Sequence, residues 1–284
     1  MSSTAARSTP DRPDATIAAL DRLRDGYRQA VPATLATLRR QAAQLDDAPD
    51  AEPVLLALRR ELHRVHGSGG SYGFAAASGV AAALETRVAQ WIADSSLDCE
   101  RRADIVRSAI HLLASAFGVE EGAAASPAGA RSAPLPAAPQ PGEVAPDVVI
   151  VDDDLALSAM LEYAIRSSGL TLAAFGSGPE ALHALLATRP SASGARPLVL
   201  LDVDLPGLDG HSLHERLAAE RPDAFRVVFM SAHTGEAGQL RALRAGALDY
   251  VVKPLSLPVL LAKLPLWLAS ARAPRPAMAS AGVG

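Results

Sequence analysis

The chain has 284 residues, of which 49% are hydrophobic and 20% are charged, a composition typical of about two globular domains with apolar cores. The net charge of −4 gives no general electrostatic reason to expect a nucleic acid or an anionic membrane as a partner. The N-terminus lacks the apolar segment of a secretory signal, and no run of about 18 uncharged apolar residues predicts a membrane span, so we expect a cytoplasmic protein. Cys99, the only cysteine, excludes a disulfide framework within the chain and is expected to be a buried structural thiol.

The N-terminal part of the chain has the apolar period of helices. Residues 1–12 lack this pattern and are expected to be disordered. The period predicts helices over about 15–45, from 54 through a glycine-rich segment, over 78–93 and over 100–117. Pro32 is expected to divide the first of these helices or to kink it. Residues 13–121 are therefore predicted to form an all-α domain, an antiparallel helical bundle with short loops.

The composition changes after this bundle. Residues 122–146 are dominated by Ala, Pro, Gly and Ser, which cannot form a core, so this segment is predicted to be a linker. Short apolar runs then alternate with helical periods: strands are predicted over 148–151, 171–175, 198–201, 226–230 and 250–252, and helices over 155–168, 179–187, 211–219, 235–245 and 257–270. Five βα repeats indicate a parallel sheet with helices on both faces over residues 147–272, followed by a disordered tail over 273–284.

The helix that begins near residue 54 carries the first candidate site. His63 lies about 130° from the centre of its apolar stripe and is predicted to face solvent. Gly67 and Gly70, four and seven residues later, lie over the same patch. Since glycine inside a helix costs about 1 kcal/mol relative to alanine, these glycines indicate a cleared surface beside a nucleophilic imidazole. The alternative is that the glycine run ends the helix and that His63 is an ordinary surface residue.

The segment HRVHGSGGSYGF resembles the signature of histidine phosphotransfer (HPt) domains, and the matching positions are His63, Val65, Gly67, Ser68 and Gly73. The resemblance covers about residues 14–118 and implies that His63 accepts a phosphoryl group, with Gly67 and Gly70 leaving room for it. His66 occupies the position where the family usually has lysine, and the resemblance implies that this position assists binding of the phosphoryl group. Because Gly70 lies four residues after it, His66 is also a competing acceptor, but agreement with the motif favours His63.

Acidic residues follow two of the predicted strands. Asp152, Asp153 and Asp154 come directly after the strand at 148–151, and Asp202 follows the strand at 198–201. In an open parallel sheet, ligands collect at the edge where the carboxyl ends of the strands meet. Carboxylates gathered there repel one another unless a cation neutralises them, and hard oxygen ligands suit Mg²⁺. The alternative is that these acids merely cap the helices that follow.

Two further strand ends carry residues that suit a phosphoryl group. Ser231 offers a hydroxyl group to a phosphoryl oxygen, and Lys253 offers a positive charge to the same group. A serine or a lysine at the end of one strand has little meaning alone. Acids, an aspartate, a serine and a lysine on four successive strand ends are far more specific, and they favour in-line phosphoryl transfer to a carboxylate.

Over about residues 147–271 this order resembles the receiver domains of response regulators. The resemblance implies a flavodoxin-like (βα)5 fold with strand order 2-1-3-4-5, with Asp202 as phosphoacceptor and with Ser231 and Tyr250 as the switch residues. It also implies a Mg²⁺ site made by Asp152, Asp153, Asp202 and the backbone carbonyl group of Asp204. Pro206 and Gly210 match the loop after the acceptor, and the Lys253–Pro254 peptide bond is expected to be cis.

The expected function is therefore that of a phosphorelay protein of two-component signalling, with phosphate carried on His63 and Asp202. We expect phosphotransfer without a kinase domain, and output through protein contacts at the receiver face made by residues 237–245, 250–252 and 257–270. The expected partners are a histidine kinase or the receiver of a hybrid kinase, and another response regulator or HPt protein. A receiver homodimer, in which Leu260, Leu264 and Trp267 dock, stays open beside core packing of these residues. The alternative of a different class is a phosphorylation-independent scaffold that sequesters a kinase or regulator.

Overall fold

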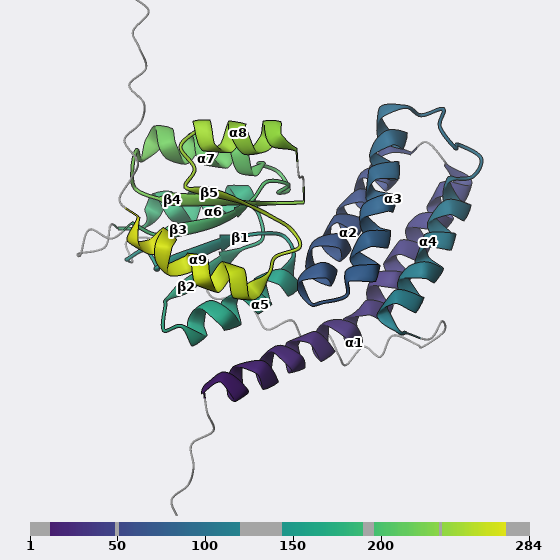
Figure 1. Cartoon of the computed structure of the whole chain (residues 1–284). Coiled ribbons are helices and arrows are strands. Elements are labelled where there is room, and N and C mark those ends of the chain that lie inside the picture. Colours follow the sequence, from purple (N-terminus) through teal and green to yellow (C-terminus); the bar gives the residue numbers. More distant parts are fainter. Residues whose placement is uncertain (1–11, 49–50, 120–143, 190–195, 233–234, 271–284) are drawn as a thin grey trace, which may run out of the picture. The chain divides into compact units, whose positions relative to one another are not determined.

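The computed structural model describes residues 12–48, 51–119, 144–189, 196–232 and 235–270. They form a helical part and an α/β part, each with its own elements (Figure 1). The expected disordered ends and almost all of the expected linker lie outside the described residues, and the domain limits set from composition stay predictions.

Four helices make the N-terminal part: α1 (Arg12–Asp47), α2 (Glu52–Ser71), α3 (Ala75–Ala93) and α4 (Arg102–Phe117). They follow one another through short loops, which is the connection that antiparallel neighbours need. The contacts run mainly between α2 and α3 and between α1 and α4. Leucine, valine and alanine side chains at helical spacing fill the centre, among them Leu38, Leu58, Leu62, Val88 and Leu113, and Trp91 is fully buried with them.

Two local expectations for this part change in the structure. Pro32 lies inside α1, which is a single helix from Arg12 to Asp47 and is not divided in two. Cys99 is exposed in the loop between α3 and α4, so the expectation of a buried thiol was wrong. α4 ends where Gly118 takes a left-handed conformation (φ +64°) and the backbone N–H groups of Gly118 and Val119 close the last turn on Ser115 and Ala114.

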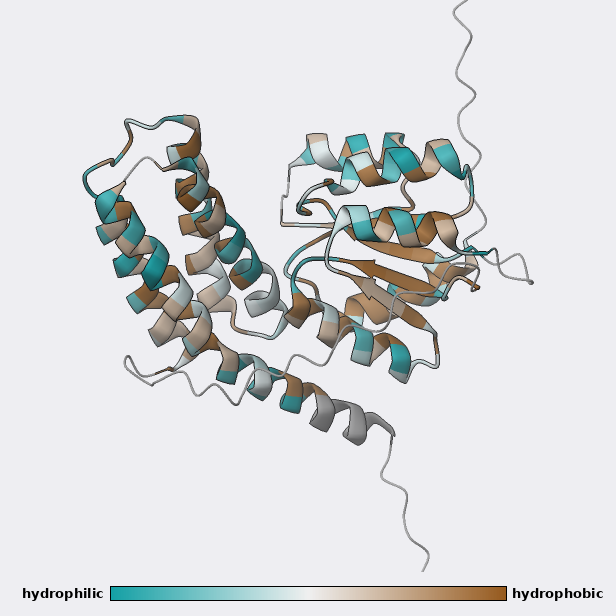
Figure 2. Cartoon of the chain, turned by 180° about the vertical axis from the view of Figure 1, so that it is seen from behind, coloured by the Kyte–Doolittle hydropathy of each residue, from teal (hydrophilic) through white to brown (hydrophobic). Residues whose placement is uncertain are grey.

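The α/β part is built on five parallel strands: β1 (Val148–Val151), β2 (Leu172–Phe175), β3 (Leu198–Asp202), β4 (Arg226–Ser231) and β5 (Asp249–Val252). Their order is β2-β1-β3-β4-β5, which confirms the predicted flavodoxin-like arrangement. In the register, Val148 pairs with Leu172 on one side and with Leu198 on the other. Every residue of β1, β2 and β3 is buried, as expected of parallel strands covered on both faces. Figure 2 shows the strands as the apolar centre of this part.

Helices follow each strand: α5 (Leu155–Ser167), α6 (Gly178–Ala187), α7 (Gly210–Glu220), α8 (Glu236–Arg244) and α9 (Leu257–Ala269). On one face of the sheet, alternate strand residues pack against α6, α7 and α8, and this cluster includes Val149, Phe175, Leu201, Leu213, Phe229 and Ala242. Among the helices of the described ranges, none is long and apolar enough to cross a membrane.

The last helix favours one of two interpretations that the sequence left open. Leu260, Leu264 and Trp267 are all buried, with at most 5% of the surface of each exposed. Trp267 Nε1 donates a hydrogen bond of 3.1 Å to Asp249 Oδ2 on β5, and Lys263 Nζ lies 2.9 Å from the same oxygen. These side chains therefore belong to the core and its polar edge, and core packing, not docking of a second receiver, explains them.

Candidate functional site

The carboxyl edge of the sheet collects the residues that the sequence predicted there. Asp152 follows β1, Asp202 ends β3, Ser231 ends β4 and Lys253 follows β5, and these four strands are neighbours in the sheet. All four side chains are buried, although their polar groups would be well hydrated at the surface. Burial of charged groups costs free energy unless they are paired, so this cluster is a specialised arrangement and not a random surface feature.

The pairing is between one ammonium group and two carboxylates. Lys253 Nζ lies 2.8 Å from Asp152 Oδ2 and 3.1 Å from Asp202 Oδ1. Asp153, half-buried, brings a third carboxylate. When all four groups are ionised, the cluster carries two negative charges in excess. A bound cation would offset this excess.

The donor set fits a divalent cation. Asp152, Asp153 and Asp202 each offer a carboxylate oxygen, and these oxygens lie within 4.8 Å of one another. An octahedral Mg²⁺ with oxygen distances of about 2.0–2.1 Å holds its ligand oxygens about 3–4 Å apart, so a small adjustment of the side chains brings these oxygens into range. Oxygen-only ligands are also the chemistry that Mg²⁺ prefers.

The acids that follow β1 have different positions. Asp154 caps α5, because its Oδ1 accepts hydrogen bonds from the backbone N–H groups of Ala156 and Leu157. Asp209, not Asp202, caps α7 by accepting from the backbone N–H group of Ser212. Helix capping therefore explains Asp154 but does not explain Asp202, which belongs to the buried cluster.

The loop after β3 depends on a close approach of the backbone. Gly210 begins α7, and a Cβ atom added there would lie 2.1 Å from the carbonyl oxygen of Asp202. Real Cβ atoms do not approach so closely, so only glycine lets α7 begin directly against the end of β3. The Lys253–Pro254 peptide bond is cis, as predicted. On β5, Tyr250 lies beneath α8, where its hydroxyl group would be 3.6 Å from a Cβ atom on Gly238.

The helical part holds the other candidate residue, and here one prediction was wrong. His63 was expected to face solvent, but only 7% of its surface is exposed. Its Nδ1 lies 3.0 Å from Oε1 of Glu85 on α3. The helix period described the apolar side of α2 and gave no indication that a polar residue on the next helix would hold the imidazole.

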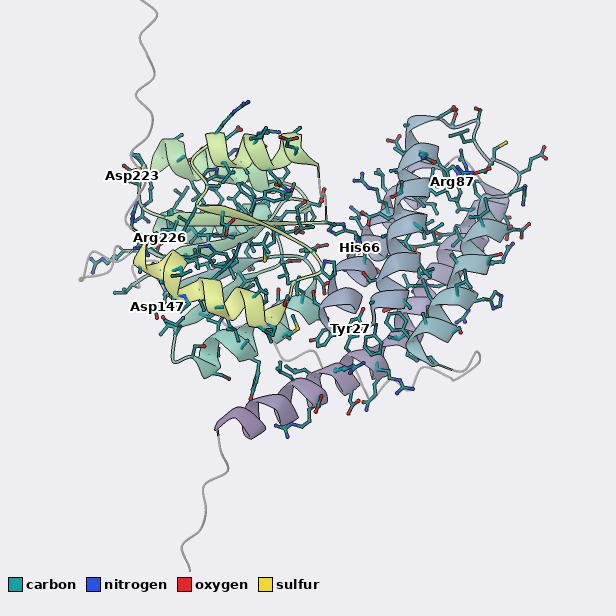
Figure 3. All side chains as sticks on the ribbon, in the orientation of Figure 1. Tyr27, His66, Arg87, Asp147, Asp223 and Arg226 are labelled. Atoms are coloured by element: carbon teal, nitrogen blue, oxygen red, sulfur yellow. The ribbon has the colours of Figure 1, made fainter. Side chains whose placement is uncertain are left out.

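The carboxylate of Glu85 contacts two histidines. Its second oxygen lies 3.4 Å from Nδ1 of His66, which is labelled in Figure 3. Both histidines belong to α2. Burial alone would raise the pKa of Glu85, but the hydrogen bonds and charges of His63 and His66 outweigh it and lower that pKa to about 2. Glu85 is therefore an ionised acceptor at neutral pH, so Nδ1 of His63 donates to it. The hydrogen on Nδ1 leaves the lone pair of the neutral ring on Nε2.

The glycine-rich segment does not end α2. The helix continues to Ser71, through Gly67, Gly69 and Gly70, which excludes the alternative that the glycines end it. Gly69 packs toward the aromatic residues of the bundle, since an added Cβ would lie 3.5 Å from the hydroxyl oxygen of Tyr27. Ser68, also buried, donates to the carbonyl oxygen of Arg64 at 2.7 Å.

Glu85 is the functional residue that sequence reasoning missed. A signal was present, because Glu85 lies at helical spacing from Ala77, Ala81 and Val88, all on the buried side of α3. An ionisable residue on an apolar face needs a partner, and in the structure this partner is the pair of histidines on the preceding helix.

Comparisons with known proteins agree with this geometry. Residues 22–116 match the family model of the Hpt domain, and residues 148–265 match that of the response regulator receiver domain. The transcriptional regulatory protein PrrA of Mycobacterium tuberculosis is 37% identical over 123 residues, which are 43% of this chain and 50% of PrrA. The phosphate regulon transcriptional regulatory protein PhoB of Rhizobium meliloti is 35% identical over 129 residues, which are 45% of this chain and 54% of PhoB.

The chain thus spans about half the length of these curated relatives. Among solved structures, a putative response regulator from Chloroflexus aurantiacus is 28% identical, with a TM-score of 0.39, over 44% of this chain and 100% of that chain.

The sheet order and the positions of the two clusters agree with these two domain matches. The chain thus carries a segment that matches the Hpt domain, followed by a segment that matches the response regulator receiver domain.

Proposed function

We propose that this protein carries phosphate on Asp202 of the receiver and on His63 of the Hpt domain. The observation that supports this most strongly is the buried cluster in which Lys253 Nζ lies 3.1 Å from Asp202 Oδ1 at the carboxyl edge of the sheet. A lysine that contacts the acceptor carboxylate can also contact a phosphoryl group bound to that carboxylate.

In the receiver, an Asp202 carboxylate oxygen attacks the phosphorus atom of the donor in line, and the donor leaves with the electron pair of its own bond to phosphorus. Lys253 compensates the charge that Asp202 brings, and the Ser231 hydroxyl group donates to a phosphoryl oxygen. Asp152, Asp153, Asp202 and the carbonyl oxygen of Asp204 would hold Mg²⁺, which when bound neutralises phosphate charge during the transfer.

In the Hpt domain, Nε2 of His63 is the nucleophile. Its lone pair forms the N–P bond as the acyl-phosphate P–O bond breaks, and the carboxylate of the donor aspartate leaves with the electron pair. The ring becomes cationic, with its proton still on Nδ1, and the Glu85 carboxylate stabilises that charge. Gly67 and Gly70 leave space for the phosphoryl group, and His66 supports it from the position that lysine usually has.

The partners follow from these two acceptors. A histidine kinase, or the receiver of a hybrid kinase, supplies phosphate, and a second response regulator or HPt protein exchanges it, all in the cytoplasm. Phosphate on Asp202 shifts Ser231 and Tyr250 and so the surface formed by α8, β5 and α9, which gives output through protein contacts. We propose no kinase activity for the chain. No observation favours the scaffold alternative, because both acceptors keep their supporting residues.

The test labels the full chain with ³²P-acetyl phosphate and Mg²⁺. We expect alkali-labile label that disappears in Asp202→Asn and persists in the control Asp223→Asn, which removes an exposed acid. Beryllium fluoride with Mg²⁺ should also bind the wild type and change its tryptic pattern, but should not do so in Asp202→Asn. Equal labelling of both variants would contradict the assignment of Asp202.

A further inference from the structure

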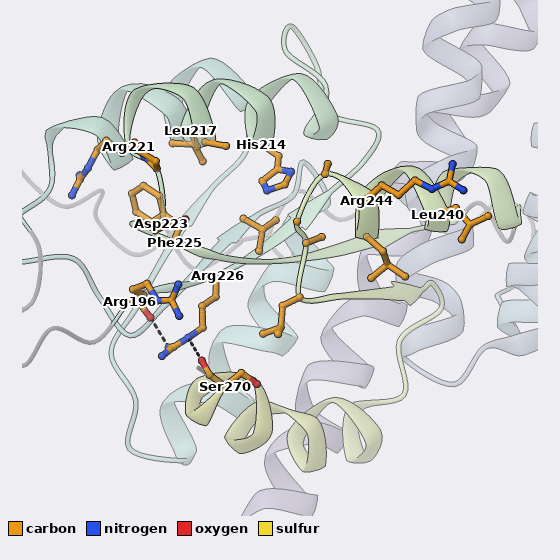
Figure 4. Close-up of a pocket in the computed structure, with 18 residues that line it drawn as sticks. Arg196, His214, Leu217, Arg221, Asp223, Phe225, Arg226, Leu240, Arg244 and Ser270 are labelled. Atoms are coloured by element: carbon orange, nitrogen blue, oxygen red, sulfur yellow. Dashed lines mark hydrogen bonds between the residues drawn. The ribbon is translucent and has the colours of Figure 1, made fainter. Parts of the chain in front are cut away.

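A cavity of about 500 Å³ lies between α7, α8 and the beginnings of β4 and β5 (Figure 4). It is at the opposite edge of the sheet from Asp202. Arg196 comes two residues before β3, and Asp202 ends it, so the four residue steps of about 3.3 Å along β3 place the Arg196 end of the cavity roughly 13 Å or more from the acceptor. The phosphorelay chemistry uses none of the residues that line it.

One wall of the cavity is apolar. Leu217 of α7 and Val227 of β4 are buried behind it, whereas Leu240 and Leu243 of α8 keep 40% and 48% of their surfaces exposed. Two neighbouring leucines exposed on one side of a cavity indicate a surface that a ligand can cover.

The other end of the cavity is positively charged. Arg196, Arg221 and Arg226 line it, and Figure 3 shows Arg226 and Asp223 at this edge of the receiver. Arg226 donates to the carbonyl oxygens of Ser270 (3.1 Å) and Arg196 (2.7 Å). These acceptors are uncharged, so they do not cancel the positive charge of Arg226.

The guanidinium of Arg221 likewise donates to carbonyl oxygens, those of Leu185 and Thr188, both at 2.8 Å. Burial lowers the pKa of Arg226, and the nearby positive charge of Arg196 adds a smaller shift in the same direction. Asp223 is the single acid among the residues that line the cavity, and it is exposed.

A polar group faces the cavity from α7. His214 is 93% buried, and its ring projects from α7 toward the cavity in Figure 4. The ring packs edge-on against Phe229, with centroids 5.5 Å apart, and Nδ1 has no hydrogen-bond partner within the described ranges. Burial, and then the charge of His211, lower the pKa of His214, so the ring is neutral. A buried nitrogen of this kind is normally paired, and a ligand in the cavity can pair it.

We propose that this cavity binds a small organic anion with an apolar body, of the class of aromatic or branched carboxylates. The anionic group lies at the arginine end, the apolar body covers Leu240 and Leu243, and a polar substituent reaches Nδ1 of His214. Four arginines line the cavity, three of them at one end and Arg244 on α8, and together with an apolar wall and one imidazole they are the combination that recognises such a molecule.

The test uses two probes that differ only in a sulfonate group: 8-anilino-1-naphthalenesulfonate and its uncharged analogue N-phenyl-1-naphthylamine, each titrated into the full chain by fluorescence. The sulfonate should bind at one site per chain and at least tenfold more tightly than the analogue. Leu243→Glu should weaken sulfonate binding at least tenfold, whereas the matched control Leu266→Glu, on an exposed leucine of α9, should leave it unchanged.

A second pair of variants tests the charge. Arg196→Gln should weaken binding of the sulfonate severalfold and leave the analogue unaffected, and the exposed Arg216→Gln should change neither. The imidazole resonances of His214, assigned by their loss in His214→Gln, should shift when the sulfonate binds. Equal affinity of both probes, or sulfonate binding that Leu243→Glu leaves unchanged, would overturn the proposal.

Discussion

Replacement of Glu85 by alanine removes the group that holds His63 in position. Glu85 Oε1 lies 3.0 Å from His63 Nδ1, and the lowered pKa of Glu85, about 2, keeps it ionised at neutral pH. A hydrogen bond to a charged group contributes about 1.5–3 kcal/mol. Since about 1.4 kcal/mol corresponds to a factor of ten, full loss of this bond in the transition state slows phosphorylation of His63 about ten- to a hundredfold.

The assay measures phosphorylation of His63 by phosphoramidate, which supplies phosphate without a partner protein, in an Asp202→Asn background so that only the histidine is labelled. Glu85→Gln keeps the shape and an acceptor oxygen, and should lose less rate than Glu85→Ala. Glu61→Ala, which removes another acid that is paired (with Arg64 at 2.9 Å), is the matched control. If both Glu85 variants, folded by circular dichroism, are phosphorylated at the rate of the control, Glu85 does not orient the nucleophile.

Three further predictions concern stability. Gly210→Ala should lower the urea midpoint strongly, because its Cβ would lie 2.1 Å from the backbone of Asp202, whereas Gly235→Ala, with no atom within 4 Å of its Cβ, should not; equal midpoints would contradict the close approach. The pKa of Glu85 is lowered from 4.5 to about 2 in the folded state, so its stabilising effect is present above about pH 4.5 and is lost as the pH falls through about 2. In Glu85→Gln, the free energy of unfolding should therefore depend less on pH between pH 5 and 2 than it does in the wild type. Lys253→Met should destabilise the receiver by about 3–5 kcal/mol, since it removes the ammonium group that two buried carboxylates contact, and added Mg²⁺ should restore part of the melting temperature; a variant that melts like the wild type without metal would refute this.

The receiver site could be predicted from the sequence because parallel strands bring their ends together. Once five βα repeats are recognised, Asp152, Asp202, Ser231 and Lys253 must lie at the same edge, whatever the details of packing. The strand limits differ from the prediction by one residue at most, for the same reason: short, fully apolar runs end abruptly at polar residues.

What the sequence did not reveal depends on contacts between distant segments. The pair of His63 and Glu85 joins two helices across 22 residues, and a helix period describes only one helix at a time. Cys99 was assigned to a core from its residue type alone, although burial is decided by the loop in which it lies. The cavity beside His214 is formed by segments from Arg196 to Ser270, and no local pattern marks it.

The most direct test of the account asks whether the two acceptors exchange phosphate. The full chain is incubated with ³²P-acetyl phosphate and Mg²⁺, and alkali-stable label is measured, because phosphohistidine survives alkali and phosphoaspartate does not. We predict alkali-stable label in the wild type that is lost in His63→Gln and also in Asp202→Asn, with alkali-labile label retained in His63→Gln. Wild-type protein without label on either residue, or alkali-stable label that persists in His63→Gln, would contradict the account.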